Sequence, residues 1–176
     1  MPSQDKSKAS SQVGMAAKKV ATNGLFVALA LVFSYVEALV PLPVLVPGVK
    51  LGLANLVVLN LLYMIDVPSV FMILVVRILL AGFMFGNLQM TIYSLAGGIL
   101  SFLIMLLAKK LKLFSMVGVS ILGGVTHNLG QLIVAMLTVS SLHLMVLFPV
   151  LLLAGTIAGA LIGLVGQRLK RLVNLA

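Results

Sequence analysis

The chain lacks cysteine altogether and carries few charged residues. Of its 176 residues, 9% are charged and 62% are hydrophobic, and the mean hydropathy is +1.27. Without cysteine, neither disulfide bonds nor thiolate metal sites can form. Because this composition is far from that of soluble domains, it predicts an all-α integral membrane protein without a separate soluble catalytic domain.

Acidic residues are especially scarce. The acids are Asp5, Glu37 and Asp66, and no two of them are close enough in sequence to meet along one helix. Hard cations such as Mg²⁺ require several oxygen ligands, so we predict no metal site. The sequence also lacks the GxxxxGK[ST] phosphate loop, so any ATP hydrolysis has to occur in another subunit. We therefore expect a protein that is not an enzyme and holds no cofactor.

Long apolar runs occupy most of the sequence from residue 20 to residue 165. A helix crosses the hydrocarbon core in about 20 residues, and the breaks in the apolar pattern predict six transmembrane helices. Their expected ranges are 19–40, 51–65, 68–85, 88–108, 116–138 and 143–167. These helices form a membrane domain over residues 19–170. It is preceded by a basic arm, 1–18, that we expect to be disordered, and followed by a short tail, 171–176.

Basic residues gather in three clusters that predict the orientation. Four lysines precede the first predicted helix, Lys109, Lys110 and Lys112 follow the fourth, and Arg168, Lys170 and Arg171 follow the sixth. Cytoplasmic flanks of membrane helices collect positive charge, and six crossings place all three clusters on one side. We therefore predict cytoplasmic termini and an outside loop at 41–50, "PLPVLVPGVK". The net charge of +9 then reflects topology and anionic headgroups, and nucleic-acid binding is not expected.

Small residues recur at four-residue spacing in two of the predicted helices. Gly155, Gly159 and Gly163 share one face of the last helix, and Gly24 and Ala28, with Ala21 one turn earlier, share a face of the first. Helices in lipid approach closely through such faces. We expect the glycines of the last helix to pack inside the bundle, whereas the face on the first helix suits either internal packing or a contact with another chain.

Arg77 and Glu37 are ionisable residues inside the predicted spans, where a charged side chain costs free energy. Arg77 lies midway along "VFMILVVRILLAGFMFG", where an ionised side chain must face the protein interior, a partner or water. Glu37 lies in the outer part of the first helix, at a depth that a long arginine side chain can reach. Two interpretations remain open: a structural Glu37–Arg77 pair, or an Arg77 that receives an anionic ligand.

The stretch "GGVTHNLGQ", 123–131, places a polar stripe inside the fifth helix. His127 and Gln131 are four residues apart and share a face, and Asn128 flanks it. Because helical backbone groups are already paired, these side chains need partners in other helices, in water or in a ligand. We expect a ligand cavity here, with interhelical hydrogen bonds as the alternative. The further candidates for its lining are Asn55 and Asn60 in the second helix and Asn87, Gln89 and Tyr93 at the start of the fourth.

The stretch "PGVKLGLANLVVLNLLY", together with "GGVTHNLGQ", the six short spans and the basic tail, resembles a known membrane family. This is the Gx transporter, or heptaprenyl diphosphate synthase component I, family, and the likeness covers about residues 19–170. That family in turn is similar to the S components of energy-coupling factor (ECF) vitamin transporters, which capture the substrate. The resemblance implies an S-component-like six-helix bundle in the bacterial plasma membrane, with a binding site open to the outside.

The same resemblance implies partners. The first helix of S components carries an Ala-x-x-x-Ala pattern that docks on a transmembrane coupling subunit, which works with two ATPase subunits. Here "GLFVALA" offers Gly24 and Ala28 at the matching positions. Glycine in place of the first alanine preserves close approach but makes the motif less specific.

The predicted function is a substrate-binding membrane subunit that captures a vitamin, cofactor precursor or isoprenoid-related molecule. Lys50, Arg77 and His127 indicate an anionic or acceptor-rich ligand. A stand-alone prenyltransferase is excluded, because it would need clustered carboxylates for Mg²⁺. A noncatalytic membrane partner of such an enzyme remains an alternative. So does a small autonomous carrier or channel, although the two halves show no clear repeat.

Overall fold

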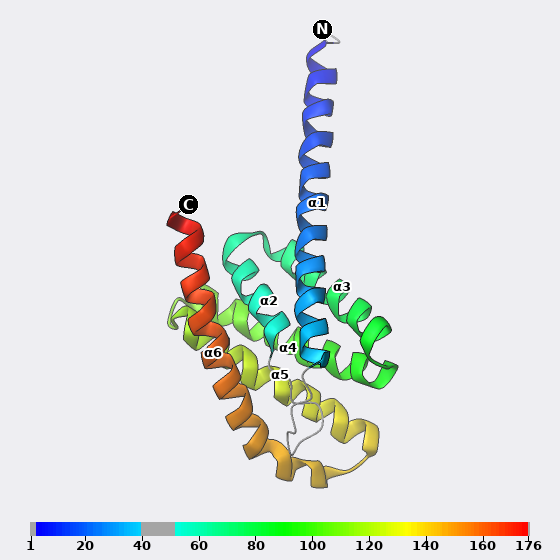
Figure 1. Ribbon diagram of the computed structural model, residues 1–176, viewed down its shortest axis with the longest axis vertical. Coiled ribbons are helices and arrows are strands. Elements are labelled where there is room, and N and C mark those ends of the chain that lie inside the picture. The colour runs from blue at the N-terminus through cyan, green and yellow to red at the C-terminus, as the bar shows by residue number, and fades with distance from the viewer. Residues whose placement is uncertain (1–2, 40–51, 176) are drawn as a thin grey trace.

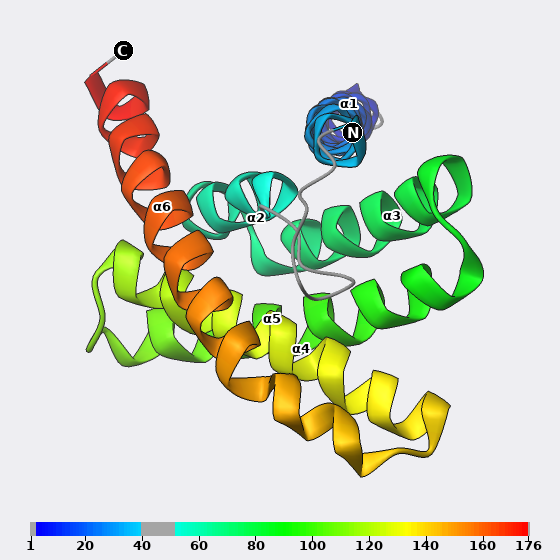
Figure 2. The same cartoon turned by 60° about the horizontal axis from the view of Figure 1, so that its bottom comes forward.

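The computed structural model describes residues 3–39 and 52–175, with side chains placed for residues 12–39 and 52–172. Within these ranges the chain is all-α, as predicted. The helices are α1 Ser3–Leu39, α2 Leu53–Met64, α3 Val67–Phe85, α4 Leu88–Leu111, α5 Met116–Val139 and α6 Phe148–Leu175, with a short 3₁₀ helix, η1, at Leu142–Leu147. The helices pack in the cyclic order α1, α3, α4, α5, α6, α2, so the ring closes where α2 meets α1 (Figures 1 and 2).

Three helices begin at side-chain caps that the sequence supplies. Asp66, Asn87 and Ser115 each accept a hydrogen bond from the backbone N–H three residues later, at the starts of α3, α4 and α5. Such caps satisfy N–H groups that the first helical turn leaves unpaired. They fix the tight turns between α2 and α3 and between α3 and α4 at the positions where the apolar pattern breaks.

The six helices agree with the predicted number, but they do not all have the length of a membrane crossing. In the described part of the chain, five segments are long and apolar enough to cross a bilayer: 12–39, 67–85, 88–111, 116–139 and 142–172. The helix α2 has 12 residues, about 18 Å of rise against a hydrocarbon core of about 30 Å. It begins after Gly52, which has a left-handed φ of 78°, and seven of its residues are buried. Thus α2 is an internal helix enclosed by its neighbours.

The basic arm does not appear as a disordered segment. The helix α1 instead continues from Ser3 through the arm into the membrane span (Figure 1). Alanine, lysine and glutamine are good helix formers, and a helix that is already nucleated by a neighbouring span extends at little cost. The connection at 41–50 lies outside the described residues.

The outer surface of the bundle is apolar. Exposed side chains include Leu25 on α1, Phe83 on α3, Leu137 on α5 and Leu161 on α6, with exposed fractions of 59% or more. A soluble monomer seldom presents so much apolar surface, whereas lipid solvates it. The structure therefore supports a multi-pass membrane protein.

Glycine contacts hold α5 against α6. A Cβ atom added at Gly159 would lie 2.7 Å from the backbone Cα of Ile121, and one added at Gly163 would lie 2.7 Å from the Cα of Val117. Gly124 of α5 faces Gly155 of α6 backbone to backbone. The predicted packing role of the glycines on the last helix is confirmed.

One end of the bundle gathers a lysine from each basic cluster. Lys19 Nζ lies 3.1 Å from Asp66 Oδ1, and Lys109 and Lys170 lie over the ring of Tyr63 with Nζ 5.0 and 4.7 Å from its centroid. The three clusters therefore share one end, as the predicted topology requires. Both termini also point toward this end in Figure 1.

A polar network at the same end ties α1 to the start of α3. Asn23 Nδ2 donates to Ser69 Oγ at 3.2 Å, and Ser69 Oγ donates to the Asp66 carboxylate at 2.9 Å. The hydrogen bond from Lys19, followed by that from Ser69, holds the pKa of Asp66 below its ordinary value. The network anchors the part of α1 that we predict to lie at the cytoplasmic side of the membrane.

We predict that Gly159→Ala destabilises the protein, whereas Gly24→Ala does not. Both glycines are helical, so the gain in helix propensity, about 1 kcal/mol, is common to both. Nothing lies within 4 Å of a Cβ added at Gly24, whereas at Gly159 overpacking costs about 1–3 kcal/mol. Thermal unfolding in detergent should show a lower Tm for Gly159→Ala than for Gly24→Ala. Equal Tm values would contradict the close packing of α5 on α6.

Labelling of single cysteines tests the orientation, since the native chain has no thiol. We predict that Leu111→Cys, at the end of α4, is labelled from the cytoplasm and Leu88→Cys, at the start of α4, from outside. Both positions are exposed, so access depends on the side of the membrane. Labelling of position 111 by an impermeant reagent added to intact cells would overturn the prediction.

Candidate functional site

A cavity of about 250 Å³ lies inside the ring of helices. All six α-helices contribute to its lining, from Ser34 on α1 to Ile162 on α6. Lipid tails surround the ring, so a polar cavity at its centre is separated from them by a layer of apolar side chains. Such concave sites with a few converging polar groups are where small molecules bind in proteins.

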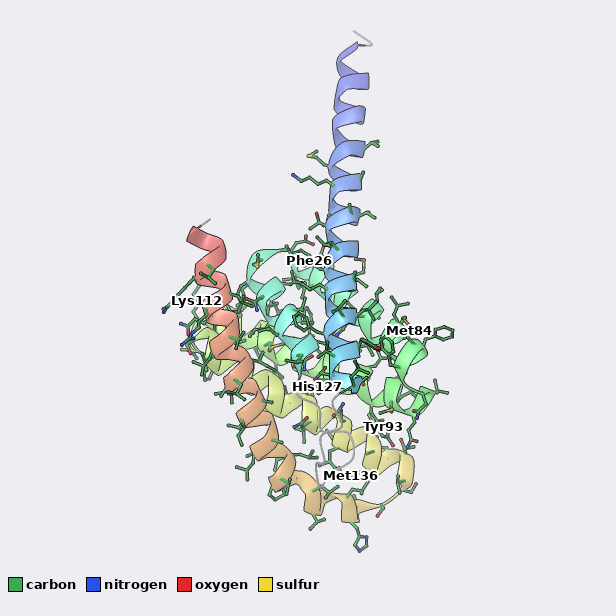
Figure 3. The ribbon with its side chains drawn as sticks, in the orientation of Figure 1. Phe26, Met84, Tyr93, Lys112, His127 and Met136 are labelled. Carbon is green, nitrogen blue, oxygen red and sulfur yellow. The ribbon has the colours of Figure 1, made fainter. Side chains whose placement is uncertain are left out.

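The cavity brings together five of the side chains that we predicted to bind a ligand. Asn55 of α2, Arg77 of α3 and His127, Asn128 and Gln131 of α5 all line it. Figure 3 shows His127 near the middle of the molecule, far from Lys112 at its side. Residues that are 76 positions apart in sequence, from Asn55 to Gln131, thus converge on one space.

Arg77 is the buried cation of this site. Its side chain is 8% exposed, and Nη2 donates a hydrogen bond of 2.8 Å to Asn55 Oδ1. The Nε atom is also buried and has no hydrogen-bond partner among the described residues. A buried guanidinium therefore keeps a free donor beside the cavity, and leaving such a donor unpaired costs free energy.

Glu37 lines the same cavity but has a different partner. Its carboxylate accepts hydrogen bonds from the backbone N–H groups of Gly52 and Leu53 at the start of α2. It acts on Arg77 electrostatically, yet in the described part of the chain the direct ion pair is that of Lys19 with Asp66. The predicted direct pair of Glu37 with Arg77 is therefore absent, because the start of α2 takes the carboxylate.

Glycine on α4 makes room for the polar stripe of α5. A Cβ atom at Gly97 would lie 2.6 Å from the His127 carbonyl oxygen and 2.9 Å from Cγ of Gln131. A Cβ atom at Gly130 would lie 2.9 Å from Cα of Gly97. The α4 contact on one side and the α6 contact on the other set the depth of His127 and Gln131 in the cavity.

Asn128 differs from its neighbours because it joins two helices. Its Nδ2 donates a hydrogen bond of 2.8 Å to the carbonyl oxygen of Leu151 on α6. Gln131 makes no side-chain hydrogen bond with any described residue, and it faces the cavity. The stripe thus combines one interhelical contact with one polar group that is available to a ligand.

The remaining candidates lie elsewhere. Asn87 is the cap of α4, and Gln89 Nε2 donates to Tyr93 Oη at 2.7 Å on the exposed first turns of that helix. None of the three lines the cavity. Asn60 donates to the carbonyl of its own helix. Lys50 lies outside the described residues.

Sequence reasoning missed the hydroxyl groups of the cavity. The hydroxyl side chains in its lining are those of Ser34, Thr91, Ser94, Ser101 and Ser120. Single serines in apolar helices look like packing residues, so none of them stands out alone. Their spacing could have indicated a shared face, because Ser94, Ser101 and Met105 fall on one side of α4. All three line the cavity.

The sequence matches a protein-family model. The model described as Heptaprenyl diphosphate synthase component I matches residues 26–169, which include every described residue of the cavity lining. The chain belongs to this family. Comparisons with curated proteins and with solved structures give no match.

The first helix of this heptaprenyl diphosphate synthase component I family member turns a small-residue face outward. Ala21, Gly24 and Ala28 are all exposed, and nothing lies within 4 Å of a Cβ added at Gly24. The face is therefore not used for packing inside the bundle. Glu37 lies nine residues after Ala28, two and a half helical turns, which places it on the opposite, cavity side of α1.

The described residues of this family member offer no metal site. No group of three or more His, Asp or Glu side chains that could hold a metal ion occurs among them. The described lining of the cavity contains one acid, Glu37, and hard cations need several oxygen ligands. Its donors instead fit a ligand rich in hydrogen-bond acceptors.

We predict that Asn128→Ala and Gln131→Ala have different effects. Loss of the Asn128 bond leaves the Leu151 carbonyl without its partner and should lower the Tm in detergent, at a cost of about 1–3 kcal/mol. Loss of Gln131 should leave the Tm nearly unchanged and weaken ligand retention about five-fold or more. Thermal unfolding and mass spectrometry of retained small molecules measure the two effects. Equal losses of stability in both variants would make the whole stripe structural.

Proposed function

We propose that the chain is a substrate-binding membrane subunit, an S component, of an ECF-type importer. The observation that carries this proposal is the cavity inside the helix ring, with the buried Arg77 guanidinium, whose Nε has no hydrogen-bond partner in the described part of the chain. Buried ionisable groups in membrane proteins are costly and mark binding or transport paths. In this proposal the cavity captures a small molecule from outside the cell.

Energy for import comes from other subunits in this proposal. The chain has no phosphate-binding loop for ATP, and we assign ATP hydrolysis to two ATPase subunits that act through a transmembrane coupling subunit. The outward face of α1 at Ala21, Gly24 and Ala28 supports such a partner, because small exposed residues allow another helix to approach closely.

The two faces of α1 give the proposed mechanism a physical link. One face borders the ligand cavity at Glu37, and the opposite face docks on the coupling subunit at Gly24 and Ala28. After capture, the loaded subunit rocks or topples against this partner and delivers its ligand inward. In this proposal the lysines gathered around Tyr63 and Asp66 lie at the cytoplasmic end of the subunit.

A second candidate function follows from the family's name. A noncatalytic membrane component of a prenyl diphosphate synthase would use the outward face of α1 to hold the catalytic subunit. In this function the catalytic subunit carries the Mg²⁺-dependent chemistry, and no group of three or more His, Asp or Glu side chains that could hold a metal ion occurs among the described residues of this chain. An autonomous carrier is a third possibility, in which the chain needs no stable partner.

Purification of the native complex from membranes in mild detergent distinguishes these functions. We expect a transmembrane coupling subunit and two ATPases to copurify with the tagged chain. Copurification of a prenyl diphosphate synthase would favour the second function, and transport by the purified chain alone in liposomes would favour the carrier.

We predict that Gly24→Trp and Ala28→Trp abolish complex formation and uptake while ligand retention by the isolated chain persists. Tryptophan on this exposed face prevents close approach of a partner helix, and a Cβ atom added at position 24 has nothing within 4 Å of it. Leu103→Trp, on an equally exposed part of α4, is the matched control and should assemble normally. Parallel loss of retention and assembly in the α1 variants would show that the face is internal packing.

A further inference from the structure

We propose that the cavity binds its ligand through a single carboxylate group placed on Arg77, and that it does not accept a diphosphate. This inference rests on the proposed function, since it names the class of molecule that the cavity captures. It follows from the hydrogen bonds of Arg77, the position of Glu37 and the charge of the lining.

The guanidinium of Arg77 has a buried N–H donor that no described residue uses. Its Nη2 reaches Asn55, and its buried Nε has no hydrogen-bond partner among the described residues. A carboxylate has two oxygens in one plane, which match two neighbouring N–H groups of a guanidinium. Such a ligand group supplies the missing acceptor and the missing negative charge together.

Glu37 does not fill this role because it caps α2. Its carboxylate accepts hydrogen bonds from the backbone N–H groups of Gly52 and Leu53 at the start of that helix. The positive end of a helix carries roughly half an elementary charge and offsets part of the charge on a nearby carboxylate. Arg77 is therefore a buried charge of the described cavity lining that has no direct counterion.

The charge of the described lining suits a ligand with one negative group. Among the described residues around the cavity, Arg77 is the one arginine or lysine and Glu37 is the one acid. Diphosphates carry several negative charges, which proteins neutralise with clustered Arg and Lys side chains or with Mg²⁺ held by carboxylates. The described lining has neither, and Glu37 would repel the additional charge.

The other residues that line the cavity indicate the chemistry of the rest of the ligand. Ser101 and Ser120 offer hydroxyl groups, and Met105, Ile78 and Ile162 offer apolar surface. The volume of about 250 Å³ lies near the lower limit of ligand pockets, roughly 300–1,000 Å³. We therefore infer a small monocarboxylate with a compact, partly apolar body.

The test identifies the small molecules that the purified chain retains. The wild type, Arg77→Gln and Arg168→Gln are purified in mild detergent and denatured in organic solvent. The released compounds are then analysed by mass spectrometry before and after carbodiimide coupling to an amine, which tags each carboxylate once. Arg168→Gln is the matched control, because Arg168 is exposed and lies outside the cavity.

The wild type and Arg168→Gln should release a compound that gains a single tag, and Arg77→Gln should release roughly ten- to a hundred-fold less of it. Bulk fatty acids from the membrane would appear equally in all three preparations. If Arg77→Gln does not fold, the Glu37→Gln, Arg77→Gln double variant removes both charges and takes its place.

Three results would overturn the inference: a retained compound that carries a phosphate or diphosphate, a compound without a carboxylate, or no compound that depends on Arg77. Copurification of ATPases with a chain that retains an uncharged compound would refute the carboxylate and leave the importer function standing. If the chain instead copurifies with a prenyl synthase and retains a carboxylate that depends on Arg77, the carboxylate inference stands and the importer function is refuted.

Discussion

Close contact between glycine-lined helices determines the rest of this structure. Lipid tails are as apolar as leucine, so burial of apolar surface gives little drive for helices to associate in a membrane, and packing at short range replaces it. Gly124 of α5 meets Gly155 of α6, and Gly130 of α5 meets Gly97 of α4. The helix α5 is therefore fixed on two sides, which turns His127 and Gln131 toward the centre of the ring. A bulkier residue at any of these contacts would move the cavity wall.

The cavity that results contains an unusual balance of charge. Arg77 and Glu37 both border it, yet the carboxylate binds the start of α2 and the guanidinium binds Asn55. An internal salt bridge would have satisfied both groups and closed the space between them. The short helix α2 prevents this, because its first N–H groups lie inside the protein and need an acceptor. Because α2 is short and begins inside the protein, Glu37 binds its first N–H groups. Arg77 Nε is therefore left without an acceptor among the described residues.

Much of the fold could be predicted from the sequence, because hydropathy and helix caps are local signals. The breaks at Asp66, Asn87 and Ser115 coincide with helix starts, and the glycines of α6 pack as expected. The length of α2 was predicted less well, since an apolar stretch of about 15 residues does not reveal whether it faces lipid or protein.

The site was only partly predictable from the sequence. His127, Gln131 and Arg77 stood out because polar side chains in an apolar helix are costly. The donors that bind the Glu37 carboxylate, the backbone N–H groups of Gly52 and Leu53, could not be found, because backbone groups leave no trace in the residue pattern. The role of Asn128 as a link to α6 and the positions of the cavity serines depend on how helices rotate about their axes, which sequence spacing alone does not give.

An experimental structure of the chain purified with its retained compound tests the central claim most directly. The account predicts density for a carboxylate within hydrogen-bond distance of Arg77 Nε, with Glu37 still bound to the N–H groups of Gly52 and Leu53. A direct Glu37–Arg77 ion pair, with the retained compound elsewhere or absent, would contradict it.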